Sequence, residues 1–252
     1  MSIVLLTALG VGGATLIGSL IGFTFKNISH KFSDIILSFA AGVMLCAAVF
    51  GLIMPSVEYG GKYGIFVTVA GIFCGAYVLN LMDKLVPHLH RLSGAEIEDH
   101  TENNEKLGKV LLFVMAIAIH NLPEGIAAGV GFGTGNTAEA LTIAGGIALQ
   151  NIPEGMVIIA PMLAAGISKK RTLIAAALTG VVEVAGTFIG YFAVSLSNAV
   201  LPFALAFAGG TMLYVISDEM IPETHAHGGE RGATYALLAG FALMLIMDFY
   251  LG

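Results

Sequence analysis

Long apolar runs, separated by short polar segments, fill almost the whole chain. A helix that crosses the hydrocarbon core of a bilayer needs about 20 mainly apolar residues. Eight runs reach this length, at residues 2–25, 33–54, 63–86, 108–131, 138–166, 171–194, 200–222 and 232–251. The pattern predicts an all-α integral membrane protein with eight transmembrane helices in a single domain over residues 1–252. The longest interruption, at about 87–107, is expected to be a loop that carries histidines and acidic residues.

Composition strengthens this assignment. Hydrophobic residues make up 57% of the chain and charged residues 11%, whereas a soluble domain carries about 25% charged residues. The two cysteines, Cys46 and Cys74, lie in apolar runs, which argues against a disulfide framework and against a cysteine zinc site. The N-terminus lacks the basic segment of a signal peptide, so we expect it to be retained as the first helix. We expect contact with the lipid bilayer and no nucleic-acid partner.

The basic residues concentrate in alternate loops. Loop two contains Lys62, and the other 10 of the 11 Lys and Arg residues lie in loops one, three, five and seven: Lys26, Lys31, Lys84, Arg91, Lys106, Lys109, Lys169, Lys170, Arg171 and Arg231. Cytoplasmic loops of membrane proteins are enriched in Lys and Arg. The odd loops are therefore expected in the cytoplasm and both termini outside.

Two distant segments have similar sequences. FAAGVML (39–45) is followed by MPSVE (54–58), and FAGGTML (207–213) is followed by IPETH (221–225). Under the predicted topology the two helices run in opposite directions. This suggests a 3+2+3 bundle, in which two inverted three-helix units flank a central pair, as in many secondary transporters. The alternative is chance, because Gly- and Ala-rich membrane helices resemble one another easily.

Two polar motifs interrupt the central pair of apolar helices: HNLPEG, beginning at His120, and QNIPEG, beginning at Gln150. His120 and Glu124 are four residues apart and share one helix face, which Asn121 also joins. Pro123 lacks a backbone N–H and clashes with the preceding turn, so we expect each helix to open at its proline. The second motif repeats this layout.

Three intramembrane carboxylates need an explanation: Glu124, Glu154 and Glu183. A charged group at the bilayer centre costs about 2.5–3.5 kcal/mol on insertion scales. Without a cation, close carboxylates repel one another and take up protons. With His120 and the motif amides they suit a divalent transition metal such as zinc or iron. The structural alternative is a Glu–His120 proton relay and amides that bind helices together.

At these motifs the sequence resembles the ZIP (Zrt/Irt-like) family of divalent-metal transporters, specifically its bacterial GufA-like branch. The resemblance covers nearly the whole chain. It implies the 3+2+3 bundle, a homodimer, and import of zinc, or of cadmium, iron, manganese or cobalt, across the bacterial inner membrane.

The resemblance also implies a binuclear midplane site. The first metal would be bound by Met44, His120, Glu124, Gln150 and Glu154. The second would be bound by Asn121, Glu124, Asn151, Glu154 and Glu183, so that both motif glutamates bridge the metals. Asn151 departs from the family pattern, since some relatives have Asp there, and this lowers the negative charge of the second site.

Further polar residues suggest a path for the metal. Near the inner ends of helices, the exit candidates are Asp83, His88, His90, Asp218, Glu219, His225 and His227. Near the outer ends, Glu58 and Asp248 are candidates for attracting cations, with ordinary solvated helix ends as the alternative.

Two other functions remain open at this point. An intramembrane metalloenzyme would use the same ligand types, although the chain has no HExxH motif. A selective channel would share the path, and the sequence does not separate it from a carrier.

Overall fold

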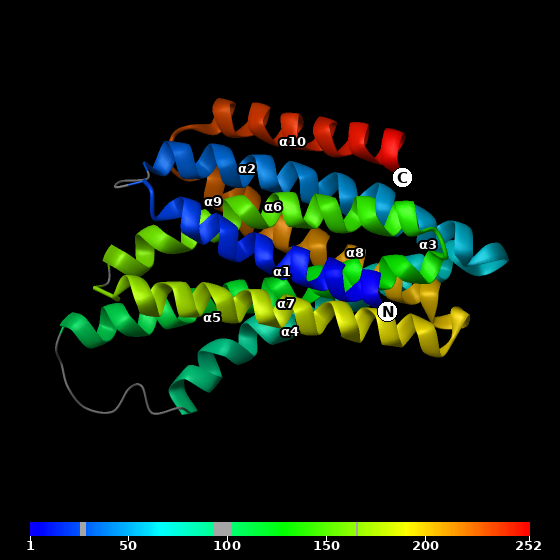
Figure 1. The fold of residues 1–252 in the computed structure, drawn as a ribbon, viewed down its shortest axis with the longest axis horizontal. Helices are drawn as coiled ribbons and strands as arrows, with labels where there is room; N and C mark the ends of the chain where they lie inside the picture. Colours follow the sequence, from blue (N-terminus) through cyan, green and yellow to red (C-terminus); the bar gives the residue numbers. More distant parts are fainter. Residues whose placement is uncertain (26–28, 93–101, 165) are drawn as a thin grey trace.

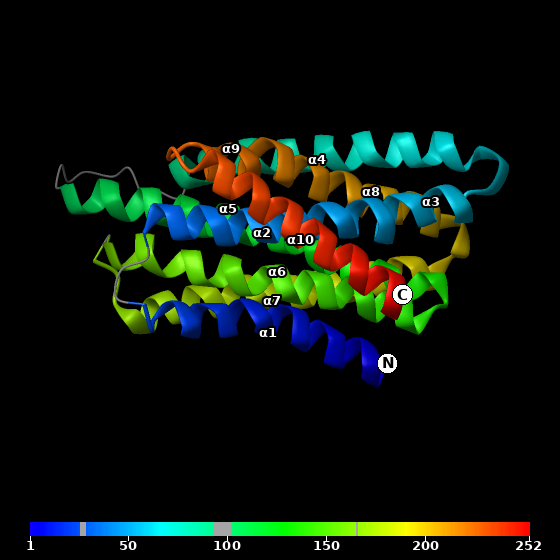
Figure 2. The same ribbon diagram turned by 90° about the horizontal axis from the view of Figure 1, so that it is seen from above.

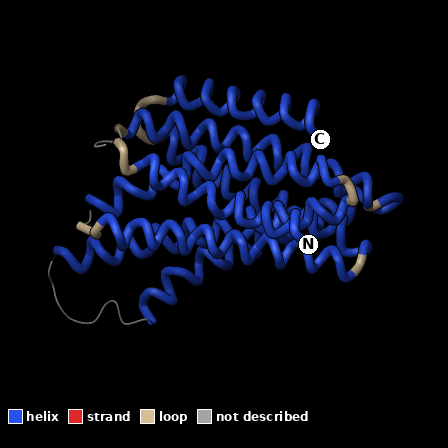
Figure 3. The backbone as a smooth tube through the Cα atoms, in the orientation of Figure 1, coloured by secondary structure: helices blue, strands red, loops and turns tan. Residues whose placement is uncertain are grey.

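The computed structural model describes residues 1–25, 29–92, 102–164 and 166–252, with side chains for all of these except 85–92, 102–113, 116 and 198. The described residues form helices and short connections, and no strand occurs among them (Figure 3). The all-α fold is therefore confirmed.

Eight long helical segments run back and forth along one bundle, with both termini at the same end (Figure 1). Six are single α-helices: α1 (Ser2–Gly22), α4 (Gly64–Leu92), α5 (Glu102–Val130), α6 (Thr137–Ala164), α7 (Lys169–Leu196) and α10 (Glu230–Leu251). The second segment consists of α2 (His30–Cys46), η1 (Ala47–Ile53) and α3 (Met54–Tyr59). The seventh consists of α8 (Leu201–Val215), η5 (Ile216–Met220) and α9 (Ile221–His225). Short 3-10 turns complete the chain: η2 (Gly61–Tyr63), η3 (Gly131–Thr134) and η4 (Asn198–Val200).

Local sequence explains where several segments begin and end. The hydroxyls of Ser29 and Ser168 accept hydrogen bonds from the backbone N–H three residues later, and so cap α2 and α7. Gly135 and Gly228 take positive φ values of 78° where the chain reverses before α6 and α10, a conformation that favours glycine.

The predicted loop at about 87–107 was too long. Helix α4 continues to Leu92 and α5 already begins at Glu102. Polar residues mark where a helix leaves the apolar core of a membrane, but they do not end the helix itself. The hydropathy pattern therefore located the apolar span rather than the helix end.

The packing of the helices repeats with inverted symmetry, as the paired motifs predicted. Helix α1 packs along α6 while α7 packs along α5, and α2 packs along α10 while α8 packs along α4 (Figure 2). Exchanging segments one to three with six to eight, and four with five, maps each pair onto its counterpart. Because consecutive segments run in opposite directions, the exchanged units are antiparallel, which confirms the 3+2+3 plan.

Glycines allow the helices of these pairs to approach each other closely. Gly18 of α1 lies against the carbonyl of Ile152 on α6, and Gly125 of α5 lies against that of Glu183 on α7. In the other pairing, Gly42 of α2 lies directly against the backbone of α10. Small residues at such crossings let helix backbones approach closely.

The helix interruptions fall at unexpected places. α5 continues through Pro123 and α6 through Pro153, so the predicted opening at these prolines is wrong: a proline removes one hydrogen bond, and the turns around it keep the helix intact. Instead, the π-helical segments η1 and η5 occupy corresponding positions in the two repeats, each just before a proline. π-helical turns are rare and concentrate at functional sites.

The surface and the interior have the polarity of a membrane protein. Large apolar side chains face outward, including Phe66 and Phe73 on α4 and Phe249 on α10, all more than 70% exposed. Seven segments meet the length and hydropathy of a membrane span among the described residues, and α5 supplies an eighth helix of 29 residues. The chain is therefore a multi-pass membrane protein.

The glycine contacts predict that one added methyl group destabilises the bundle. A Cβ at Gly18 would collide with the carbonyl oxygen of Ile152, whereas a Cβ at Gly13, on the same helix, meets no atom within 4 Å. Overpacking typically costs about 1–3 kcal/mol. We expect Gly18→Ala to lower the thermal unfolding temperature of the detergent-purified protein and Gly13→Ala to leave it equal or higher. Equal temperatures for both variants would contradict the packing.

Candidate metal centre

Three helices bring the predicted carboxylates together inside the bundle. Glu124 on α5 is 1% exposed, Glu183 on α7 is fully buried, and Glu154 on α6 is half-buried. The carboxylates of Glu154 and Glu183 lie close enough to repel that of Glu124. The close packing of α5 against α7 therefore concentrates negative charge in the interior.

Two amides hold these carboxylates in place. The Nε2 of Gln150 donates a hydrogen bond of 2.8 Å to Oε1 of Glu124. The Nδ2 of Asn151 donates to Oε1 of Glu183 at 2.5 Å and to the carbonyl of Val11 at 3.2 Å. An aspartate at position 151 would have no N–H to donate and would add a fourth negative charge. The hydrogen bond from Asn151 thus orients the Glu183 carboxylate. The side-chain oxygen of Asn151 takes no part in this bond.

Several buried polar atoms around the carboxylates have no hydrogen-bond partner in the described part of the protein. Apart from His120 Nε2, which lies beside Glu219, six of them belong to five predicted ligands: Asn121 Nδ2 and Oδ1, Glu124 Oε2, Gln150 Oε1, Asn151 Oδ1 and Glu183 Oε2. An unsatisfied buried polar group is unfavourable, and native structures have few. Five of these six atoms are oxygens, which can bind a cation. Carboxylate and amide oxygens that are available to bind a cation therefore line this part of the interior.

His120 faces a different helix from the one expected. Its Nε2 lies 2.8 Å from Oε1 of Glu219, which belongs to the π-helical segment η5. Asp83 on α4 joins them, and one ligand atom from each of the three residues lies within 4.8 Å of the others. The structure therefore links a predicted midplane ligand to two predicted exit residues, and this cluster has the composition of a metal site.

Other predicted residues surround this cluster or support it. Asp218 is exposed beside Tyr214, whose hydroxyl accepts a 2.7 Å hydrogen bond from Nδ2 of Asn80. Met44 is fully buried in the main apolar core, on α2, which packs against α6. The side chains of His88 and His90 lie outside the described residues.

Glu58 and Asp248 lie at the end of the bundle that carries the termini, one at the end of α3 and one in the last turns of α10. Sequence reasoning missed a third acidic residue there. Glu139, in the first turn of α6, lies close enough to both carboxylates to be repelled by them. Its position three residues after Asn136, which caps the helix, looked like an ordinary helix start, and only the fold reveals its neighbours.

The two remaining exit candidates differ from each other. The Nδ1 of His225 lies 2.9 Å from the carbonyl of Ile221, and its Nε2 lies 3.3 Å from the hydroxyl of Thr234. His227 pairs through Nδ1 with Asp34, at 3.2 Å from Oδ1. Asp34, buried near the start of α2, was missed because a lone acidic residue at a helix start is usually solvated.

Comparison with known proteins agrees with this architecture. The sequence profile described as "ZIP Zinc transporter" matches residues 96–248. The chain is 40% identical to the zinc transporter GufA of Myxococcus xanthus over 98% of both proteins. It is 36% identical to the zinc transporter ZIPB of Bordetella bronchiseptica, over 95% of this chain and 78% of that protein. The zinc transporter ZIP11 of Homo sapiens is 30% identical, over 95% of this chain and 94% of that protein.

All three relatives are named as transporters, so the chain is a membrane transport protein rather than an intramembrane metalloenzyme. The profile covers more than half of the chain, and the similarity to GufA extends over its full length. The resemblance suggested by the two PEG motifs is thereby confirmed: the chain belongs to the ZIP zinc transporter family.

Proposed function

We propose that this protein imports zinc, and related divalent transition metals, into the cytoplasm by alternating access through a binuclear site in the middle of the bundle. Glu124 and Glu154 bridge the two metals. Met44, His120 and Gln150 complete the ligands of the first metal. Asn121, Asn151 and Glu183 complete those of the second metal.

The observation that carries this proposal is the set of six unpartnered buried atoms around three carboxylates. Hydrogen bonds from Gln150 and Asn151 satisfy only one oxygen each of Glu124 and Glu183. A divalent cation satisfies the remaining oxygens and offsets the repulsion among the carboxylates. Imidazole together with carboxylate favours zinc and its neighbours over magnesium or calcium.

The direction of transport follows from the charge bias and the acidic residues at the two ends. Ions enter past Glu58, Asp248 and Glu139, at the end that carries the termini. They leave through the Asp83–His120–Glu219 cluster towards Asp218 and the loop histidines. The predicted loops on the side where ions leave contain 10 of the 11 basic residues, and this bias supports a cytoplasmic position for that end.

The packing supports a rigid-body motion. α1, α5, α6 and α7 contact one another through glycine and backbone atoms, and this four-helix body carries all three carboxylates. Where α6 meets the flanking helices, glycines face side chains instead: Gly51 faces Ile143, and Gly146 faces Met244. A side-chain interface slides more easily than an interlocked backbone contact. The four-helix body moves against α2, α4, α8 and α10 and takes the metal with it.

The π-helical segments suit this motion. η5 places Glu219 opposite His120. A ligand on the flanking helices therefore faces a ligand on the moving four-helix body. The contact between these two side chains is made when the site opens towards the cytoplasm. We further propose that the protein works as a homodimer in the bacterial inner membrane, with both termini outside.

Removing one carboxylate is expected to stabilise the protein without metal. In Glu124→Gln the amide keeps the shape of the side chain and removes one of three buried acidic groups whose charged forms are unfavourable without a metal. We expect a higher thermal unfolding temperature than wild type in chelator. Zinc at 100 times its dissociation constant stabilises a binding protein by about 2.7 kcal/mol, and the part of this gain that comes from the midplane site should be lost in the variant. The exposed Glu223→Gln serves as control, with a wild-type zinc response; the same response in Glu124→Gln would reject Glu124 as a ligand.

Zinc uptake should depend on the bridging residues. Glu124→Ala and Glu154→Ala each remove a carboxylate that contacts both metals, so we expect no uptake above empty proteoliposomes for either variant. The measurement is time-resolved zinc influx with a fluorescent indicator inside the vesicles. Wild-type rates in both variants would refute the site, and non-saturable flux in the wild type would favour a channel.

Glu219 is expected to act in release rather than in binding at the midplane. Glu219→Gln removes the charge that faces His120 but leaves the three carboxylates intact. We expect zinc to stabilise this variant as it does wild type, while the maximal uptake rate falls by about tenfold, the loss typical of removing one charged partner of a metal site. An unchanged maximal rate would remove Glu219 from the path.

A further inference from the structure

A second group of metal-binding side chains lies at the end of the bundle opposite the termini. It consists of His30 and Asp34, at the start of α2, and His227, in the connection between α9 and α10. The His30 and His227 rings stack with centroids 4.8 Å apart and an interplanar angle of 27°. Nδ1 of His227 lies 3.2 Å from Oδ1 of Asp34. These three residues, hereafter the His–Asp–His cluster, share no residue with the midplane site.

Asp34 is the unusual member of the cluster. It is only 3% exposed, although it lies in the second turn of a helix that begins at the bundle end. Its Oδ1 faces His227, while its buried Oδ2 has no hydrogen-bond partner in the described part of the chain. A carboxylate is seldom buried with one oxygen unsatisfied, because the lost hydration is not replaced. The free oxygen points to a cation as the missing partner.

The spacing of the donor atoms suits such a cation. Zinc binds imidazole nitrogen at 2.0–2.1 Å and carboxylate oxygen at 2.0–2.2 Å with tetrahedral geometry, so two of its ligands lie about 3.3 Å apart. The measured separation of 3.2 Å between His227 Nδ1 and Asp34 Oδ1 matches this value. A zinc ion between these two atoms would bind Oδ1 and, if Asp34 is a bidentate ligand, Oδ2 as well, which supplies the partner that Oδ2 lacks.

His30 can supply a third ligand. It precedes Asp34 by four residues, so the two side chains emerge from the same face of α2. His30 is exposed, and its ring already rests on that of His227. Rotation of this side chain about its own bonds turns a ring nitrogen towards the Asp34–His227 pair.

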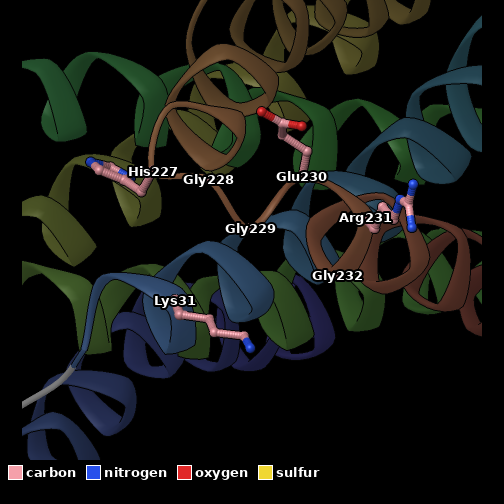
Figure 4. A pocket seen from close by; sticks show the side chains of 7 residues that line it. All are labelled: Lys31, His227, Gly228, Gly229, Glu230, Arg231 and Gly232. Carbon is pink, nitrogen blue, oxygen red and sulfur yellow. The ribbon is translucent and has the colours of Figure 1, made fainter.

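Space for the ion and its water lies beside the cluster. His227 and residues 228–232 line a cavity of about 410 Å³ together with Lys31 (Figure 4). The side chains of Lys31 and Arg231 extend away from His227 (Figure 4). Gly229 passes over Asp34, and a Cβ there would lie 4.0 Å from the unpartnered Oδ2.

We propose that His30, Asp34 and His227 form a separate binding site for a transition-metal cation, with zinc as the expected ion and water as the fourth ligand. The site goes beyond the proposed transport function: it shares His227 with the proposed exit path but none of the ligands of the midplane site. A bound ion ties the start of α2 to the connection between α9 and α10.

The test is the zinc stoichiometry of the purified full-length protein, titrated in detergent against a chromophoric chelator. Asp34→Asn, His227→Ala and His30→Ala should each bind one equivalent of zinc less than wild type. Glu230→Gln, which makes the same charge change three residues from His227, should bind as much as wild type. Cobalt should give visible absorption typical of nitrogen and oxygen ligands, and the part of it due to this site should disappear in the same three variants.

Two further measurements separate this site from others. Combining each substitution with Glu124→Gln should still remove one equivalent, which shows that the loss is independent of the midplane site. Asp34→Asn also removes a buried charge, so its unfolding temperature is measured in parallel; if it fails to fold, the exposed His30→Ala decides the question. Unchanged stoichiometry in His30→Ala and His227→Ala would overturn the proposal and leave Asp34 and His227 as a structural ion pair.

Discussion

Three carboxylates lie inside a bundle whose outside is apolar. Because polar groups that are buried without partners are unfavourable, the surrounding helices must supply partners for their oxygens. Glu124 and Glu183 are almost inaccessible, and their nearest amides satisfy one oxygen of each. Glycine contacts bring α5 directly against α7 and α1 against α6, so the helices that carry the carboxylates are closely packed. We propose that a divalent cation is the partner that these carboxylates lack.

The inverted repeat explains why the two PEG motifs meet, and the structure explains why they differ. Gln150 donates to Glu124 on the opposite helix and so belongs to the central pair. His120, its counterpart, lies beside Glu219 on the flanking segment. One motif therefore contacts the carboxylate cluster through its glutamine, and the other contacts the flanking segment through its histidine. The two symmetric motifs thus differ in their partners at this position.

The sequence predicted well whatever depends on the apolar character of the chain. Eight spans, the paired motifs and the three buried carboxylates all follow from hydropathy and from the high energy of polar groups in a membrane. It failed where contacts with neighbouring residues determine the local structure. A proline was expected to open α5, but the surrounding turns kept it helical, and the breaks occur as π-helix in η1 and η5. The partners of His120 and the burial of Asp34 depend on contacts between distant segments, which no local pattern encodes.

The central claim is that a metal ion completes the carboxylate cluster, and anomalous diffraction from crystals of the zinc-loaded protein tests it most directly. Data collected on both sides of the zinc absorption edge locate the ion without assumptions about the ligands. The account predicts zinc peaks bonded to oxygens of both Glu124 and Glu154, at about 2.0–2.2 Å. Zinc peaks confined to the bundle ends, with none between α5 and α6, would contradict it.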